Sequence, residues 1–379
     1  MAATEQARRA RIVRADPHEA AVSPLELFFD LVFVFALTQV TARMAEDLSW
    51  GGLLRGMLVL AAIWWAWAAY AWLTNEVEAR RRDVRLAIFG AMVAMLLASL
   101  AIPRAFEGDA LLFACAYLGV RVMHVALFAA ASDDIGVRQA ARALVPTSTI
   151  APALLIVASA FDGAPQTALW IAALAIDYVG GAVRGIEGWR LSPGHFAERH
   201  GLIVIIALGE SIVAIGVGAA GLALGAGELA AAALGVVVAA ALWWVYFDDA
   251  PERVEQRLHG VAGRERNVLA RDTFSFLHLP LVAGIVLLAL GVKKTLGDVG
   301  EPLKLVSAAA LCGGAALYLA AGVAFRWRCL GELGRERLLA AAGCAAVLPL
   351  ATEVGSLVGL AAVAAVCAAL VAYESAGVG

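Results

Sequence analysis

Charged residues are scarce in this chain of 379 residues. Asp, Glu, Lys and Arg make up 16% of it, while 62% of its residues are hydrophobic. Soluble domains are about 45–50% apolar and about 25% charged. A soluble fold of this length could not cover so much apolar surface, so the composition excludes cytosolic globular, disordered, collagen-like and coiled-coil proteins. Lipid must surround most of the chain.

Cysteine and the common enzyme motifs are also scarce or missing. The five cysteines show no CxxC and no paired spacing, and four of them lie in apolar runs. They therefore indicate small core residues, not a disulfide or metal framework. The sequence contains no GxSxG, no GxxxxGK[ST] and no GxGxxG after a strand. We expect no resident metal, no cofactor and no nucleic-acid partner.

Twelve apolar runs are candidate membrane spans, because a helix needs about 20 apolar residues to cross a bilayer. Six runs carry no charge: Gly56–Asn75, Ala143–Phe161, Leu229–Phe247, Thr273–Val292, Leu305–Phe325 and Val354–Tyr373. Two others are Leu86–Pro103 and a shorter run from Leu338 to Thr352 that contains Pro349. Four runs reach full length only with a charge inside: Leu25–Thr41, Ala110–Ala131, Gln166–Val183 and His200–Ala220. The sequence thus predicts an all-α polytopic membrane protein with about twelve transmembrane helices.

The positions of the basic residues test this span count, because cytoplasmic loops carry the excess of Lys and Arg. With the N-terminus inside, 22 of the 29 basic residues fall in inside segments, six fall in outside loops, and Arg121 lies within a span. Such a bias in strict alternation is hard to obtain with a wrong count. We therefore expect both termini in the cytoplasm, with membrane lipids around the spans.

A weak internal similarity suggests two halves. Trp64-Trp65 follows Asp30 by 34 residues, and Trp243-Trp244 follows Glu210 by 33. The offset between these patterns is about half the chain, which predicts a parallel repeat of six spans plus six. The alternative is that tryptophan pairs simply mark helix ends in lipid. The expected organisation is a polar, basic N-terminus (1–22), a first half (23–190) and a second half (191–379).

A few ionisable residues lie inside the predicted spans, where a charge costs about 3 kcal/mol or more. Asp177, Glu210 and Arg121 each lie about 16–18 Å from a span end, near the bilayer midplane. Asp30 and His278 lie about 10 Å deep. His124 shares a helix face with Arg121, and Glu26 shares one with Asp30. Acids outnumber the single predicted buried cation, Arg121, which favours the handling of protons or cations.

Structural roles could also explain these residues. Arg121 could pair with Asp177 or Glu210 as a static tie between helices. Asp30 could serve the helix start signalled by Ser23-Pro24. His278 could bind a backbone carbonyl released by Pro280. These alternatives stay open on sequence grounds.

A polar segment precedes the seventh predicted span. His195, Glu198 and Arg199 lie there, with His200 next to them. His195 and Glu198 share a helix face but His200 does not, and the spacing is not that of a zinc motif. We interpret His195, Glu198 and Arg199 as residues at the cytoplasmic edge of the membrane, with Glu198 complementing a helix N-terminus.

Three stretches of the chain resemble the bacterial low temperature requirement protein A (LtrA) family. They are the ELFFDLVFVF segment beginning at Glu26, the HFAER segment beginning at His195 with LGESI beginning at Leu208, and the WWVYFD segment beginning at Trp243 with LHLPL beginning at Leu277. The resemblance covers about Pro24 to Tyr373. It implies a multi-span bacterial membrane protein, and it marks the matched residues as important positions without assigning their roles.

We expect a transporter or channel-like protein that moves a small solute, a proton or another cation. Glu210, Asp177 and Arg121 would form the central site, and Asp30, His124 and His278 would relay protons. An alternative is a membrane-embedded enzyme that acts on a lipid or isoprenoid from the cytoplasmic side with Glu26, Asp30 and Glu198 as acid and base groups. The sequence leaves the substrate and the oligomeric state open.

Overall fold

The regular structure of this chain is helical throughout the part that a computed structural model describes, residues 22–76, 81–131, 135–183, 189, 191–248 and 250–377. The only bridge between extended segments in these ranges joins Pro302 to Gly355. The expected all-α fold is therefore confirmed. Long apolar runs favour helices here because a helix satisfies its own backbone hydrogen bonds without water.

The chain forms two compact units, each built from several segments. Unit 1 comprises Met1–Gln39, Met57–Arg199 and Leu258–Arg271, and unit 2 comprises Val40–Gly56, His200–Arg257 and Asp272–Gly379. Five elements pass from one unit into the other: α2 (Pro24–Glu46), α3 (Trp50–Glu76), α8 (Pro193–Ala219), α10 (Ala250–His259) and the π-helix η2 (Arg271–Phe276). The expected division into halves at residues 190 and 191, and the six-plus-six repeat, stay predictions.

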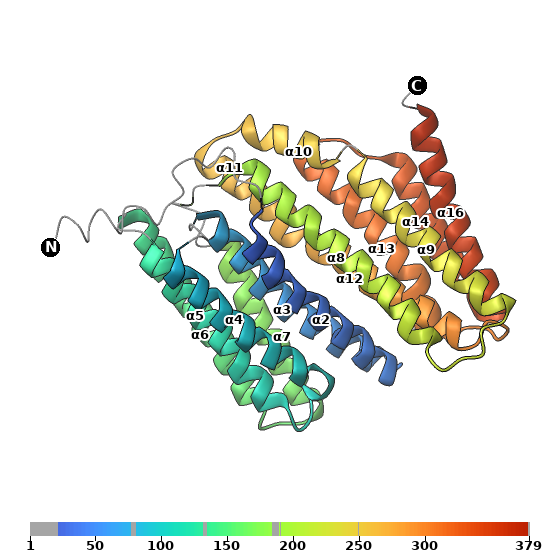
Figure 1. The fold of residues 1–379 in the computed structure, drawn as a ribbon, viewed down its shortest axis with the longest axis horizontal. Helices are drawn as coiled ribbons and strands as arrows, with labels where there is room; N and C mark the ends of the chain where they lie inside the picture. The colour runs from blue at the N-terminus through green and yellow to red at the C-terminus, as the bar shows by residue number, and fades with distance from the viewer. Residues whose placement is uncertain are drawn as a thin grey trace. The chain divides into compact units, whose positions relative to one another are not determined.

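Unit 1 contains a layer of antiparallel neighbours that follow one another along the chain. Each of α4, α5 and α6 packs against the next helix in sequence, up to α7 (Figure 1). The elements that lie wholly in unit 1 are α4 (Arg82–Ala101), η1 (Ile102–Arg104), α5 (Ala110–Ala131), α6 (Ile135–Ala158), α7 (Gly163–Val183) and α11 (Gly263–Ala270). The α3 part of this unit contributes much of its core, including Trp64, Trp67 and Tyr70.

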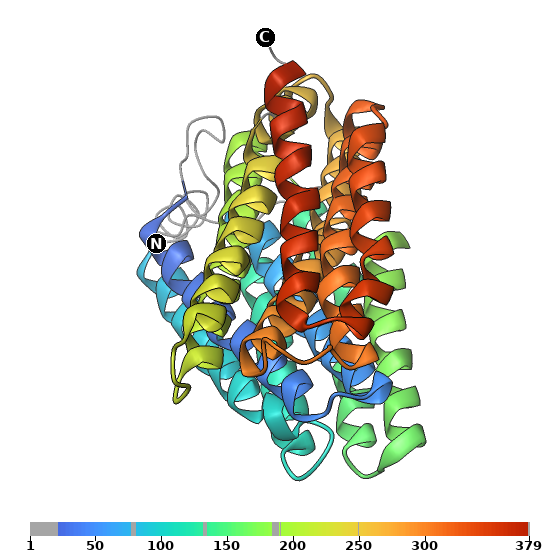
Figure 2. The ribbon, with the colours of Figure 1, turned by 90° about the vertical axis from the view of Figure 1, so that its right-hand side faces the viewer.

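Unit 2 is organised around a tightly packed helix pair, α12 and α13. The C-terminal helix α16, drawn in dark red in Figure 2, lies beside α9 and also packs against α14. The elements that lie wholly in unit 2 are α9 (Ala226–Phe247), α12 (His278–Gly297), α13 (Leu305–Leu330), α14 (Arg335–Ala346), α15 (Leu348–Glu353) and α16 (Ser356–Gly377).

Large apolar side chains are exposed along whole helix faces. On α4, Leu86, Val93, Leu97 and Leu100 are all exposed and follow a helical spacing of seven, four and three residues. A water-soluble monomer seldom exposes a continuous apolar stripe of this kind. The stripe is the surface expected to face lipid acyl chains.

Ten predicted spans correspond to helices that are long and apolar enough to cross a bilayer, within the residues that are described. They are α2, α3, α4 with η1, α5, α7, α8, α9 with α10, α11 through α12, α13 and α16. The run in α6 is shorter, Leu144–Ala158. The run near the C-terminus is divided at Val347, because Pro349 cannot donate to the carbonyl four residues earlier and so ends α14. The count of twelve spans and the positions of the termini stay predictions.

Candidate functional site

The start of α2 is built by a local sequence motif. Ser23, Pro24 and Glu26 form a capping box, in which the Glu26 backbone N–H faces Ser23 Oγ at 3.4 Å and the Ser23 N–H donates to Glu26 Oε2 at 2.8 Å. Pro24 occupies the first helical position, where its missing N–H costs nothing. This cap fixes the helical phase of α2, so Glu26 and Asp30, four residues apart, share one face.

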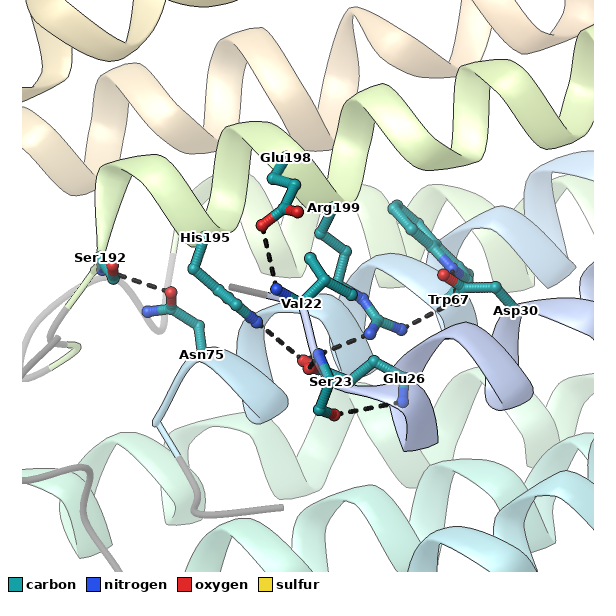
Figure 3. A network of polar contacts seen from close by, with 10 residues as sticks. All are labelled: Val22, Ser23, Glu26, Asp30, Trp67, Asn75, Ser192, His195, Glu198 and Arg199. Atoms are coloured by element: carbon teal, nitrogen blue, oxygen red, sulfur yellow. Dashed lines mark hydrogen bonds and ion pairs between the residues drawn. The ribbon is translucent and has the colours of Figure 1, made fainter. Parts of the chain in front are cut away.

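The same spacing recurs on α8, where His195 and Arg199 also lie four residues apart. His195 Nε2 lies 2.9 Å from Glu26 Oε1, and Arg199 Nη1 lies 3.3 Å from the same oxygen. Arg199 Nη2 donates to Asp30 Oδ1 at 2.9 Å. Figure 3 shows the His195 and Arg199 side chains pointing from α8 toward Glu26 and Asp30 of α2.

A tryptophan of α3 completes this arrangement. Trp67 Nε1 donates to Asp30 Oδ1 at 2.8 Å, and the Arg199 guanidinium carbon lies 5.8 Å from the centre of the indole ring. We call Glu26, Asp30, Trp67, His195 and Arg199 the α2–α8 cluster. All five residues belong to unit 1, and all five are buried, with Asp30 and Arg199 at 0% exposure.

The two oxygens of Asp30 differ in their environment. Oδ1 accepts both hydrogen bonds, from Arg199 and from Trp67. Oδ2 is buried and has no hydrogen-bond partner among the described residues. Most buried polar atoms in folded proteins are bonded, so an unpartnered carboxylate oxygen in an apolar span is an exception that needs a reason.

Two backbone contacts flank the α2–α8 cluster. The Val22 N–H donates to Glu198 Oε2 at 2.9 Å, and the Ser192 N–H donates to Asn75 Oδ1 at 3.2 Å (Figure 3). Glu198 itself is exposed. The Glu198 carboxylate therefore lies at the N-terminus of α2, and not at the N-terminus of its own helix, α8.

A second buried ion pair joins α5 to α7 in unit 1. Arg121 Nη2 donates to Asp177 Oδ1 at 2.9 Å and to Ser148 Oγ at 3.1 Å. The Tyr117 hydroxyl donates to Asp177 Oδ2 at 3.1 Å, so both oxygens of Asp177 are bonded. Of the pairings considered for Arg121, the structure therefore forms the one with Asp177.

His124 and Tyr70 lie between these two groups of residues. The His124 ring centre is 5.6 Å from that of Tyr70, and Tyr70 stacks on Phe29, the residue before Asp30, at 4.9 Å. The Tyr70 hydroxyl donates to the carbonyl of Val120, next to Arg121. Aromatic rings thus fill the space between the α2–α8 cluster and the Arg121–Asp177 pair.

The remaining predicted residues belong to unit 2. His278 Nε2 lies 2.8 Å from the Tyr246 hydroxyl, and Nδ1 lies 3.0 Å from the Thr273 carbonyl oxygen. A carbonyl only accepts, so Nδ1 carries the proton of the neutral ring and Nε2 accepts from Tyr246. Glu210 is buried in the unit 2 part of α8.

The carbonyl that His278 binds is released by the π-helix and not by Pro280. Within η2, the Leu277 N–H donates to the Asp272 carbonyl, five residues back. The His278 imidazole contacts the Thr273 carbonyl, to which the Leu277 N–H would donate in an ordinary α-helix. The expected carbonyl, four residues before the proline, would have been that of Phe276.

His195 and Arg199 are buried between helices and not exposed on the protein surface, and their position at the cytoplasmic edge of the membrane stays a prediction. Arg121 is also not the only buried cation: Arg43, Arg199 and Arg337 are buried too. Among the described residues, buried acids still outnumber buried arginines, since Glu26, Asp30, Glu76, Asp177 and Glu210 are buried. The sequence-based count omits Arg199 because the apolar run begins at His200. The residues before the run pack inward through the first turns of α8.

Sequence reasoning missed several partners, namely Trp67, Tyr117, Ser148 and Tyr246. Their residue types are common in membrane helices and give no signal on their own. Trp64 and Trp67 are buried, whereas Trp243 and Trp244 are 44% and 42% exposed. Trp67 could have been found from its helical spacing, three residues after Trp64 and three before Tyr70.

No group of three or more His, Cys, Asp or Glu residues is placed to hold a metal ion in the part of the chain that is described. The carboxylates of the α2–α8 cluster contact mainly hydrogen-bond donors. The contacts within the cluster are ion pairs and one hydrogen bond from Trp67.

Comparison with known proteins agrees with the resemblance seen in the motifs. The bacterial low temperature requirement A protein (LtrA) family matches residues 21–372. An uncharacterised protein of Rhizobium meliloti (strain 1021) is 31% identical over 306 residues, which cover 78% of this chain and 74% of that protein. No solved structure matches. The chain belongs to the bacterial low temperature requirement A (LtrA) protein family.

Proposed function

We propose that this protein is a transporter or channel-like protein of the bacterial plasma membrane that moves a small solute, a proton or another cation. The observation that carries the proposal is Asp30. Its carboxylate is fully buried in an apolar span, and its Oδ2 has no hydrogen-bond partner among the described residues. Ionisable groups inside membranes are costly and commonly mark ion pathways and proton relays.

A comparison of the two buried aspartates of unit 1 supports this assignment. Both oxygens of Asp177 are bonded, one to Arg121 and one to Tyr117. This is the pattern of a static tie, which needs every polar atom satisfied. Asp30 has one oxygen bonded and one left over, and the left-over oxygen is able to accept a proton or contact a cation.

The charges of the α2–α8 cluster also support the proposal of proton or cation transport. Two carboxylates, Glu26 and Asp30, share a single arginine, and His195 is the remaining ionisable group of the cluster. With His195 neutral the cluster carries a net charge of −1, so the binding of one positive charge brings its net charge to zero. We propose that His124, also in unit 1, contributes a further position along the path.

The test is a flux measurement on the full-length protein in liposomes. A pH-sensitive dye inside the vesicles follows protons, and imposed gradients of sodium, potassium and small solutes are tested in turn. We expect flux above that of protein-free vesicles, and its loss in Asp30→Asn. Asp162→Asn is the matched control, because Asp162 is an exposed aspartate. Absence of flux under every gradient would overturn the proposal.

A further inference from the structure

Every described group that contacts the Asp30 carboxylate is a hydrogen-bond donor. The Arg199 guanidinium and the Trp67 indole N–H both approach Oδ1, at 2.9 and 2.8 Å (Figure 3). The charged or titratable groups that face Asp30 are Arg199 from α8 and Glu26 from α2 itself, and the α3 neighbour, Trp67, does not titrate. His195 faces Glu26 from α8.

These surroundings disfavour a metal cation at Asp30. Hard cations such as calcium and magnesium take about six or more oxygen ligands. Asp30 lies in the interior of α2, whose own backbone carbonyls accept the hydrogen bonds of the helix. Arg199 already places a fixed positive charge 2.9 Å from Oδ1. A proton needs only one acceptor atom, and Oδ2 provides it.

We infer that Asp30 is a proton-binding residue and that the ion this protein moves is the proton, with Arg199 as a built-in counter-cation. This inference rests on the proposed transport function. The proton adds to Oδ2 and forms an O–H bond there, while Oδ1 remains the acceptor for Trp67. Asp30 thereby loses its negative charge.

Arg199 has a second partner when this happens. Its Nη1 lies 3.3 Å from Glu26 Oε1, so the guanidinium charge stays compensated by Glu26 after Asp30 is protonated. The spacing of four residues on both helices produces this arrangement, because it places two carboxylates within reach of one planar guanidinium. Proton binding at Asp30 would therefore weaken the ion pair between Arg199 and Asp30, and Glu26 would become the main partner of Arg199 on α2.

The decisive measurement is infrared difference spectroscopy of the full-length protein in lipid as the pH is lowered. We expect a protonated-carboxyl band that is lost in Asp30→Asn and kept in Asp162→Asn. Asp30→Glu should keep a band with a shifted midpoint, because it retains a titratable carboxyl. The inference is overturned if the Asp30→Asn protein is folded and keeps the full band, or if the Asp30→Glu protein is folded and shows the band with an unshifted midpoint.

A second measurement needs no variant. In liposomes where sodium and potassium are replaced by the impermeant cation N-methylglucamine, we expect wild-type proton flux to continue. A requirement for sodium or potassium would overturn the assignment of the proton. If no gradient drives any flux, the transport proposal fails, while the infrared band still decides whether Asp30 binds a proton.

Discussion

At the scale of single residues, the most consequential side chain is Arg199. It is the cation shared by Glu26 and Asp30, and all three are buried. Removing one partner of a buried ion pair is far more costly than removing an exposed one, because it leaves an uncompensated charge out of water.

We predict that Arg199→Ala lowers the free energy of unfolding by about 3–5 kcal/mol. Denaturant titration in detergent micelles measures this change. Arg104→Ala is the control, because Arg104 is 61% exposed in its pair with Asp109, and it should change the free energy by less than about 1 kcal/mol. In Arg199→Ala/Asp30→Asn, part of the loss should be recovered. Equal effects of Arg199→Ala and Arg104→Ala would contradict the buried pair.

His278 also matters at the scale of single residues, because its imidazole contacts a backbone carbonyl of the π-helix η2. His278→Ala would remove the imidazole that contacts both the Thr273 carbonyl and the Tyr246 hydroxyl. Each buried unsatisfied group costs about 1–3 kcal/mol. Tyr246→Phe breaks only one of the two contacts, so we expect it to be the milder variant in the same titration. A Tyr246→Phe protein less stable than His278→Ala would argue against this account.

At the scale of helices, the closest approach occurs between α12 and α13. A Cβ on Gly314 would lie 2.5 Å from the Leu288 backbone nitrogen and 2.8 Å from the Gly284 carbonyl oxygen. A Cβ on Gly291 would meet the Leu311 backbone at a similar distance. Small residues let helix backbones approach closely in membranes, where packing replaces the hydrophobic effect as the force of association.

Adjacent glycines of α13 provide a matched test of this contact. Gly314→Ala should destabilise the protein by about 1–3 kcal/mol, because the added methyl group overlaps backbone atoms that cannot move aside. Gly313→Ala should be neutral or stabilising by up to about 1 kcal/mol, since nothing lies within 4 Å of its Cβ position and alanine is the better helix former. Thermal unfolding of the two variants in detergent, at equal protein concentration, compares them directly. Similar melting temperatures would refute the close contact.

At the scale of the whole molecule, the open question is how many times the chain crosses the membrane. The alternation of basic residues predicts twelve crossings, whereas ten helices meet the length and hydropathy expected of a span in the described part of the chain. The difference lies in α6 and in α14 with α15. Both contain proline: α6 is a continuous helix that includes Pro146 and Pro152, and Pro349 lies at the start of α15.

Cysteine labelling in a cysteine-free background tests the orientation. We predict that Asp162→Cys reacts with a membrane-impermeant maleimide in intact cells, and that Leu333→Cys reacts only after permeabilisation. Both positions are exposed, so lack of reaction reports the side of the membrane. A reporter fused to the C-terminus should lie in the cytoplasm if α14 and α15 together cross the membrane. A C-terminal reporter outside the cell would remove that crossing.

The sequence by itself determined the helical class, ten of the spans and the buried acids, since lipid imposes a strong and simple rule on composition and run length. It also pointed to Glu26, Asp30, His195 and Arg199, because they lie in the segments that resemble the LtrA family. Only the tertiary structure decided which charges meet. His195 and Arg199 lie about 170 residues from Glu26 and Asp30, and no local pattern places α8 against α2. Which charges pair also depends on how deeply each side chain is buried in the protein. Neighbouring helices bury the first turns of α8, although the polar residues of those turns are typical of a membrane edge. The unpartnered oxygen of Asp30, on which the functional proposal rests, exists only as a consequence of that packing.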